Sequence, residues 1–131
     1  MIKRFLEWIG LKEKLNKQNH EPPLFKENEV WWCYIGENVG NEINGKSEKF
    51  TRPIFIFKKY DRYTFFGLPL TSKKKVGSWY VPISFLNTSQ TVVLSQSRIF
   101  DYRRLDKKIG ELTLGEGVFI REEFTHLHMT S

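Results

Sequence analysis

Residues 52–69 read RPIFIFKKYDRYTFFGLP, two apolar β-type runs on either side of Asp61-Arg62. Runs rich in Phe, Ile and Tyr that are separated by two turn residues are typical of an antiparallel hairpin. We place its strands at Arg52–Tyr60 and Tyr63–Pro69. Similar runs predict further strands at Glu29–Ile35, Ser78–Pro82 and Thr91–Gln96, with a short continuation at Arg98–Tyr102. Several short strands punctuated by turn residues favour a small antiparallel barrel or sandwich.

The two ends of the chain carry helical patterns. Met1–Asn16 is expected to form an amphipathic helix, because apolar residues recur there at helical spacing. These residues are Ile2, Phe5, Leu6 and Ile9, with Trp8 and Leu15 nearby. We expect the helix to dock on its own domain; a basic helix at a membrane surface is the alternative. The chain divides into this helix (residues 1–17), a polar linker (18–28) and a main domain (29–131). In the main domain, Leu105–Leu112 is expected to hold one helical turn or more, and Glu116–His128 a terminal helix.

Composition bounds the class of protein. A chain of 131 residues with 40% hydrophobic and 15% aromatic content has room for one domain and one core. The net charge of +6 favours a polyanionic partner such as nucleic acid or an acidic protein. One cysteine excludes an internal disulfide framework and indicates a reducing compartment. The sequence shows no signal peptide and no run near the roughly 20 apolar residues of a membrane span, so we expect a cytoplasmic protein.

Residues 40–47 read GNEINGKS and fit the P-loop pattern, which would place Lys46 on the phosphates of a nucleotide. A P-loop leads into a helix whose N-terminus faces those phosphates. Here Pro53 follows within a few residues and opens a β-type run, so no such helix can form. We therefore interpret residues 36–49 as a long, mobile loop between two strands. Loops of this length are usually functional or disordered.

Polar side chains at the ends of two predicted strands are candidates for a catalytic site. Arg52 opens one strand beside Pro53, and Thr71 and Ser72 follow the other. If the strands are neighbours, these side chains converge beneath the loop that carries Glu42. A cation, hydroxyl donors and a carboxylate suit cleavage of RNA by its own 2′-hydroxyl, which requires proton transfer and stabilisation of charge on phosphorus.

Metal and thiol chemistry are not expected. His20 lies in the linker and His126 and His128 lie near the C-terminus, so the histidines do not form a ligand cluster. Cys33 lies inside a predicted strand and is interpreted as an inert buried thiol. Because the nucleophile of the RNA reaction belongs to the substrate, neither a metal ion nor another cofactor is required.

Each candidate also has a purely structural interpretation. An Arg before Pro at a strand start is most often a surface residue or an ion-paired one. Thr71 and Ser72 are also common turn residues, and Glu42 suits a solvated loop. The run Lys73-Lys74-Lys75 is either a solvated turn or a set of phosphate contacts. The aromatic residues are core or interface residues, with base stacking as the alternative for any that prove exposed. These are Trp31, Trp32, Phe55, Phe57, Phe65 and Phe66.

An ordered series of short motifs resembles the MazF/PemK family of toxin endoribonucleases. The motifs are EVWW (29–32), GENVGNE (36–42), GK (45–46), RPI (52–54), PLTS (69–72), LSQSR (94–98) and RRL (103–105). They follow the order of the family from about Glu27 to Gly110, which is most of the main domain. The leading helix is similar to the extension of longer PemK-like members.

The resemblance implies a mainly β (α+β) fold, an SH3-like small β-barrel of the MazF/PemK/CcdB type with peripheral helices. It implies a homodimer that acts as an mRNA interferase of a toxin–antitoxin pair. Such enzymes cleave single-stranded RNA without a metal ion and leave 2′,3′-cyclic phosphate and 5′-hydroxyl ends. It also implies an antitoxin with an acidic, initially disordered segment, which the positive charge of this chain suits.

Matched position by position, the resemblance makes Arg52 the catalytic arginine and Thr71 the threonine that assists it. Glu42 matches the acidic residue of the loop, and Ser72 the adjacent hydroxyl. The chain departs from some members at Val93 and Ser95, where they carry an Arg and an Asp, and this leaves the general base open.

The remaining expectations concern RNA contacts and a second function. Contacts to RNA are expected from Asn41, Lys46, Lys73, Lys74, Gln96 and Arg98. The alternative function is a non-catalytic RNA-binding or gyrase-inhibiting protein on the same barrel.

Overall fold

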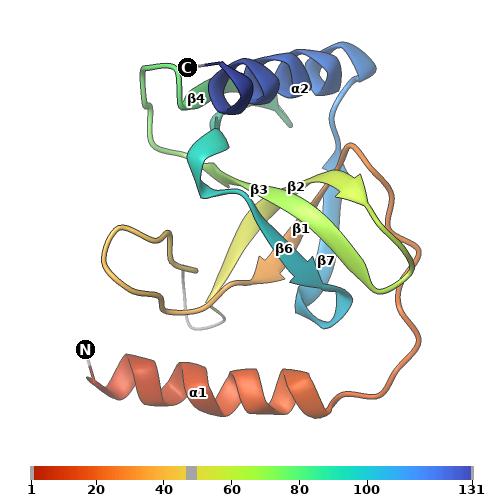
Figure 1. The fold of residues 1–131 in the computed structure, drawn as a ribbon. Helices are drawn as coiled ribbons and strands as arrows, with labels where there is room; N and C mark the ends of the chain where they lie inside the picture. The colour runs from red at the N-terminus through yellow and green to blue at the C-terminus, as the bar shows by residue number, and fades with distance from the viewer. Residues whose placement is uncertain (1, 47–49, 131) are drawn as a thin grey trace.

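The computed structural model describes residues 2–46 and 50–130, which form seven strands, two helices and two short 3₁₀ turns (Figure 1). In chain order these are α1 (Ile2–Lys17), β1 (Glu29–Tyr34), β2 (Thr51–Lys59), β3 (Thr64–Thr71), β4 (Tyr80–Phe85), β5 (Thr88–Val93), η1 (Leu94–Gln96), β6 (Arg98–Asp101), η2 (Tyr102–Arg104), β7 (Leu105–Glu111) and α2 (Leu114–Met129). Three of the residues predicted above lie outside the described part of the chain: Met1, the side chain of Ile2 and Ser47 of the P-loop pattern. The end of the predicted loop, residues 47–49, also lies outside it.

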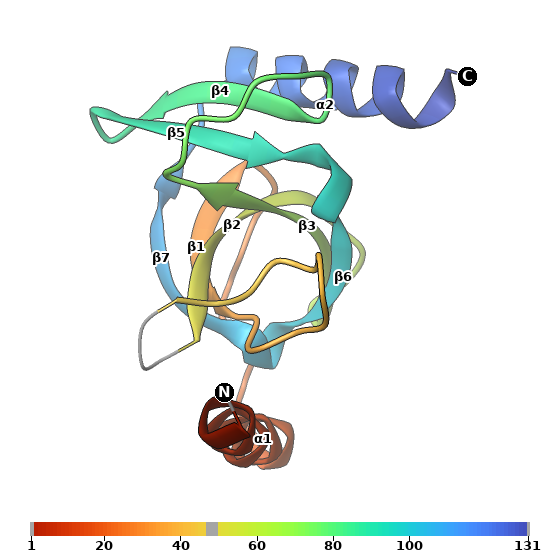
Figure 2. The same ribbon diagram turned by 90° about the vertical axis from the view of Figure 1, so that its left-hand side faces the viewer.

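The strands form one antiparallel sheet in the order β4-β5-β3-β2-β1-β7, with β6 paired to the first half of β3. Figure 2 shows β7, β1, β2, β3 and β6 curling around a common centre, with β4, β5 and α2 on one side. In the described part of the chain β6 pairs only with β3, and the sheet is not closed. The predicted mainly β class is confirmed, and the expected barrel is present as a strongly curled sheet.

The buried side chains of the curled sheet form two cores, because successive side chains of a strand point to opposite faces of the sheet. Trp31, Cys33, Ile54 and Ile56 lie in the core inside the curl. The other core, between the curled sheet, β4–β5 and α2, holds Val30, Phe55, Leu68, Leu70, Val81, Val92 and Ile120. The predicted linker also contributes to the inner core, since Phe25 is fully buried there.

Gly67 lies where β3 packs most closely against the inner core. A Cβ at this position would lie 2.5 Å from Ile54 Cγ2 and 3.0 Å from Phe100 Cε2. We expect Gly67→Ala to destabilise the fold by about 1–3 kcal/mol, because the added methyl overpacks the core. Urea denaturation measures this. Gly10→Ala is the control: nothing lies within 4 Å of its added Cβ, and alanine favours a helix. Equal stability of the two variants would contradict the tight packing.

The predicted N-terminal helix docks on its own domain. Trp8 and Leu15 are buried against Phe50, whereas Leu6 is 62% exposed and Ile9 is also exposed. Of the apolar residues that predicted this helix, Trp8 and Leu15 therefore face the domain, whereas Leu6 and Ile9 do not. No helix in the described ranges is long and apolar enough to cross a membrane.

Two strand predictions were displaced along the chain. The structure has Tyr80–Phe85 and Thr88–Val93 in place of Ser78–Pro82 and Thr91–Gln96, and residues 94–96 form a 3₁₀ turn. The cause is a two-residue hairpin turn at Leu86 and Asn87, which both have positive φ. Such turns usually carry Gly, Asn or Asp, and Leu86 gives no such signal.

The expectation of a helical turn at Leu105–Leu112 was wrong, because the segment is strand β7, paired antiparallel with β1. In the described part of the chain this edge strand pairs only with β1, and its middle carries exposed Asp106, Lys107 and Lys108. Lysine is common on edge strands because it discourages pairing with other chains. The terminal helix predicted at Glu116–His128 is confirmed and begins earlier, at Leu114, where Thr113 and Glu116 form a capping box.

Candidate functional site

Arg52 lies at the start of β2, opposite Cys33 of β1. Its side chain is only 7% exposed. The Nε group donates to the carbonyl of Asn44 at 2.8 Å, and Nη1 donates to the carbonyl of Leu70 at 3.2 Å. Burial lowers the pKa of Arg52 from its ordinary value, yet arginine remains protonated in proteins. Two of its five N–H groups are used in these bonds, so the guanidinium is a fixed cation with donors left for an anion.

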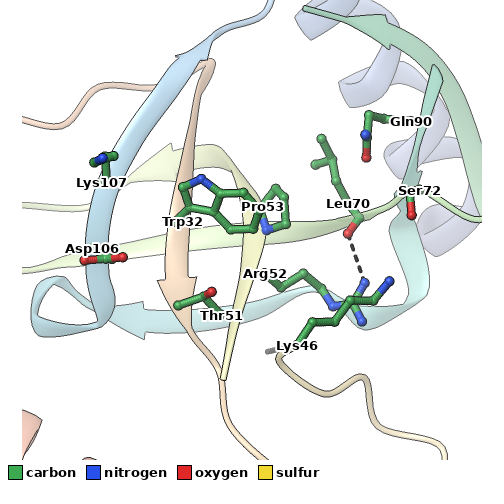
Figure 3. Close-up of a pocket in the computed structure, with 10 residues that line it drawn as sticks. All are labelled: Trp32, Lys46, Thr51, Arg52, Pro53, Leu70, Ser72, Gln90, Asp106 and Lys107. Carbon is green, nitrogen blue, oxygen red and sulfur yellow. Dashed lines mark hydrogen bonds between the residues drawn. The ribbon is translucent and has the colours of Figure 1, made fainter. Parts of the chain in front are cut away.

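The guanidinium borders a cavity of about 410 Å³ (Figure 3). The residues that line it are Trp32, Lys46, Thr51, Arg52, Pro53, Leu70, Ser72, Gln90, Asp106 and Lys107. Figure 3 shows Lys46 beside the Arg52 guanidinium, and Asp106 and Lys107 on the other side of Trp32. Three cations from three different parts of the chain therefore border one cavity, which suits an anionic ligand.

The two predicted hydroxyl residues have different surroundings. Ser72 lines the Arg52 cavity. Thr71 is the last residue of β3 and is buried, and its Oγ1 accepts from the backbone N–H of Lys73 at 3.2 Å. Its described hydrogen bond is thus the local turn contact that its structural interpretation predicts. The exposed Lys73 and Lys74 follow in that turn.

The loop after β1 is folded back over Arg52. The N–H of Gly45 donates to the carbonyl of Gly36 at 2.7 Å, and Lys46 pairs with Thr51. Inside the loop, the side-chain amide of Asn38 donates to the carbonyls of Ile35 and Ile43. The described part of the predicted loop, residues 36–46, is therefore held in a folded conformation by its own polar groups, and this conformation presents the Asn44 carbonyl to Arg52.

Glu42 does not line the cavity of Arg52. Its carboxylate accepts from the N–H of Val39 at 2.8 Å. It lines a second cavity, of about 420 Å³, together with Gln96 and Arg98. Partial burial lowers the pKa of Arg98, and the charge of Glu42 partly offsets this.

Gln96 holds the loop with both ends of its amide. Its Oε1 accepts from the N–H of Ile43 at 3.2 Å, and its Nε2 donates to the carbonyl of Asn41 at 3.1 Å. The predicted RNA-binding residues Asn41 and Gln96 are therefore hydrogen-bonded to each other, while Lys46 lines the Arg52 cavity.

Sequence reasoning missed three groups around Arg52: Asn44, Gln90 and Lys107. Asn44 acts through its backbone carbonyl, which no side-chain pattern reveals. Lys107 lies in the segment that was expected to be helical. In the structure this segment is strand β7, which pairs with β1 and places Lys107 opposite Trp32.

The groups expected to take no part in chemistry also have defined places. Cys33 is fully buried, and burial raises the pKa of its thiol. His126 and His128 lie on α2. Within residues 2–46 and 50–130, no group of three or more His, Cys, Asp or Glu could hold a metal ion.

Comparison with known proteins gives the family. The family described as "PemK-like, MazF-like toxin of type II toxin-antitoxin system" matches residues 26–120. The chain belongs to this family. All the candidate site residues lie inside the matched range, whereas α1 lies outside it. No curated protein matches the sequence significantly.

Solved structures of two MazF toxins and of a mycobacterial endoribonuclease have a similar fold. The MazF of Deinococcus radiodurans has a TM-score of 0.62 at 18% identity, over 83% of this chain and 97% of that chain. Mycobacterium tuberculosis toxin MazF-mt6 has a TM-score of 0.59 at 14% identity, over 79% and 98%. A mycobacterial endoribonuclease in complex with its cognate antitoxin has a TM-score of 0.60 at 14% identity, over 80% and 95%. At these identities the likeness establishes the fold.

Proposed function

We propose that this MazF-like toxin is an endoribonuclease that cleaves single-stranded RNA at Arg52. The observation that carries the proposal is the buried guanidinium, fixed by Asn44 and Leu70 at the edge of a cavity that two lysines also line. A fixed cation in a site shielded from water stabilises developing negative charge more strongly than a solvated one.

In the proposed reaction a base removes the proton of the 2′-hydroxyl, and the 2′ oxygen bonds to the adjacent phosphorus. The bond from phosphorus to the 5′ oxygen breaks, and that oxygen takes up a proton. The products are a 2′,3′-cyclic phosphate and a 5′-hydroxyl. The free N–H groups of Arg52 donate to the phosphoryl oxygens as their charge grows, and Ser72 and Lys46 are further donors that line the same cavity. The substrate supplies the nucleophile, so this route needs no metal ion.

The cavity also offers a place for a base next to the scissile phosphate. Trp32 is 38% exposed and lies between Arg52 and Lys107 in Figure 3, so an RNA strand that contacts both cations passes over its indole. Trp31, by contrast, is buried. We therefore propose base stacking for Trp32 and a core role for Trp31.

Trp32→Ala is expected to weaken RNA binding about 10-fold, and Trp32→Phe much less, because any aromatic ring can stack on a base. Fluorescence anisotropy with a labelled RNA that carries 2′-deoxyribose at the cleavage site measures binding without cleavage. Trp79→Ala is the control, since Trp79 is exposed and does not line the cavity. Equal affinities for wild type and Trp32→Ala would contradict the stacking role.

The proposal includes partners of the toxin. We expect an acidic antitoxin, which the net charge of +6 and the antitoxin complex of the mycobacterial endoribonuclease support. We also expect a homodimer acting in the cytoplasm.

The experiment that tests the function is RNA cleavage with mapped ends. Purified protein and a long RNA are incubated in EDTA, and the fragments are analysed for cyclic phosphate and 5′-hydroxyl ends. Cleavage with these ends, and growth arrest on expression without an antitoxin, support the nuclease. Tight RNA binding without cleavage across varied sequences would favour the non-catalytic alternative instead.

A further inference from the structure

Helix α1 lies against the loop that covers Arg52. Figure 1 shows the helix running below this loop and below the end of the curled sheet. The helix lies outside residues 26–120, which match the family, so its contacts are a feature of this chain beyond the matched toxin domain. These contacts reach both ends of the loop between β1 and β2.

Arg4 bridges the two ends of the loop. Its Nε donates to the carboxylate of Glu37 near the start of the loop, and its Nη2 donates to the carbonyl of Gly45 near the end at 3.1 Å. The guanidinium also lies 4.2 Å from the centre of the Phe50 ring. Glu37 is largely buried, so this ion pair is better shielded from solvent than an ordinary surface pair.

Trp8 supports the same segment from below. It is 4% exposed, and its ring centre lies 5.6 Å from that of Phe50. The indole packs directly on the backbone of Gly36, where a Cβ would lie 1.9 Å from Trp8 Cε2. Gly36 also has φ of +79°, a conformation that favours glycine. The start of the loop is thus shaped to accept this tryptophan.

The contacts continue from the loop to Arg52. Gly36 and Gly45 are joined by a backbone hydrogen bond of 2.7 Å. Asn44, the neighbour of Gly45, presents the carbonyl that accepts from Arg52 Nε at 2.8 Å. Of the two bonds that orient the guanidinium, the one to Leu70 comes from β3 and the one to Asn44 comes from the loop. A displaced loop therefore removes one of the two.

We propose that α1 positions the catalytic arginine, with Arg4 and Trp8 as positioning residues that act through Glu37, Gly36 and Gly45. The inference rests on the proposed nuclease function, because its consequence is the rate of RNA cleavage. A guanidinium held by two bonds is already oriented for the phosphate, whereas one held by a single bond must be ordered during the reaction. The helix therefore raises the rate of the chemical step without touching RNA.

The test compares charge variants of the ion pair. Arg4→Glu and Glu37→Arg are each expected to lower kcat about 10-fold with little change in KM. The double variant Arg4→Glu/Glu37→Arg is expected to recover part of kcat, because it restores the ion pair but not the hydrogen bond to the Gly45 carbonyl. The substrate is a short RNA with one mapped cleavage site, and full-length protein is assayed well below the melting temperature of each variant. Lys14→Ala is the control, because Lys14 is exposed on the same helix. Unchanged kcat in both single variants, or no recovery in the double variant, overturns the proposal.

Hydrogen–deuterium exchange gives a readout that does not depend on catalysis. Arg4→Glu should speed exchange in residues 36–46, and Lys14→Ala should not. Unchanged exchange in Arg4→Glu overturns the positioning role even if wild type cleaves RNA. A wild-type protein that cleaves no RNA, but whose loop exchange responds to Arg4→Glu, overturns the nuclease function and supports the anchoring of the loop. The two failures are therefore distinguishable.

Discussion

Replacing Arg52 with alanine is expected to lower the rate of RNA cleavage about 10²- to 10³-fold, the range for loss of a fixed donor to a charged transition state. The reason is geometric as well as electrostatic. The Asn44 and Leu70 carbonyls orient the wild-type guanidinium at the cavity. Among the described residues that line this cavity, no other is an arginine. Initial rates on a short RNA with one mapped site, at saturating and limiting concentrations, separate the loss in kcat from any change in KM.

Arg52→Lys separates charge from geometry. Lysine keeps the positive charge but loses the planar fork of donors, so we expect activity between that of wild type and Arg52→Ala. Arg62→Ala is the matched control, because Arg62 is exposed in the β2–β3 turn and its described ion pair is with Glu21 at the surface. Circular dichroism and melting temperatures show whether each variant is folded. A folded Arg52→Ala protein with wild-type kcat would exclude Arg52 as the catalytic cation.

The part of the fold that the sequence predicted is the part with strong local signals. The Asp61-Arg62 turn divides two runs of large apolar residues, and β2 and β3 follow it as expected. Strand β7 was missed because its sequence, LDKKIGE, carries few apolar residues. It is a strand because β1 pairs with it, and such long-range pairing leaves no trace in local periodicity.

Predictions for the candidate site also agreed with the structure where they rested on local sequence and differed where they depended on the fold of a loop. Arg52 was predicted as a site residue from its motif and from its place beside Pro53, and in the structure it lines one cavity with Ser72. Glu42 was expected beside them, but it faces the second cavity with Arg98. The direction in which a loop folds back depends on contacts far away in sequence. Here these are Gln96, which binds the loop 53 and 55 residues away, and Arg4.

Glu29→Gln is expected to destabilise the fold by about 1–3 kcal/mol at neutral pH, because a buried group that is hydrogen-bonded as an anion loses its charge. Glu29 is 3% exposed. Its Oε1 accepts from Trp31 Nε1 and from the N–H of Lys26, each at 2.9 Å, and its Oε2 pairs with Lys108 Nζ at 3.0 Å. In the variant, an amide NH₂ group can face the ammonium of Lys108, and two donors then oppose each other.

The pH dependence follows from the pKa of Glu29. Burial by itself raises this pKa, but the hydrogen bonds from Trp31, Lys26 and Lys108 outweigh burial and lower it below 4.5. A lowered pKa contributes stability that is present above about pH 4.5 and is lost as the pH falls through the folded-state value. The stability difference between wild type and Glu29→Gln should therefore be constant near neutral pH and shrink below pH 4.5. Urea denaturation at several pH values measures it.

Glu111→Gln is the control for this prediction, since Glu111 is exposed and lies opposite Glu29 in the β1–β7 pair. A stability difference between wild type and Glu29→Gln that does not change between pH 7 and pH 3 would contradict the ionised state of Glu29.

Glu29 also affects the candidate site, through the pairing of β1 with β7. The register that places Lys108 opposite Trp31 places Lys107 opposite Trp32. The buried carboxylate that holds Lys108 therefore also fixes the strand that presents Lys107 to the cavity of Arg52.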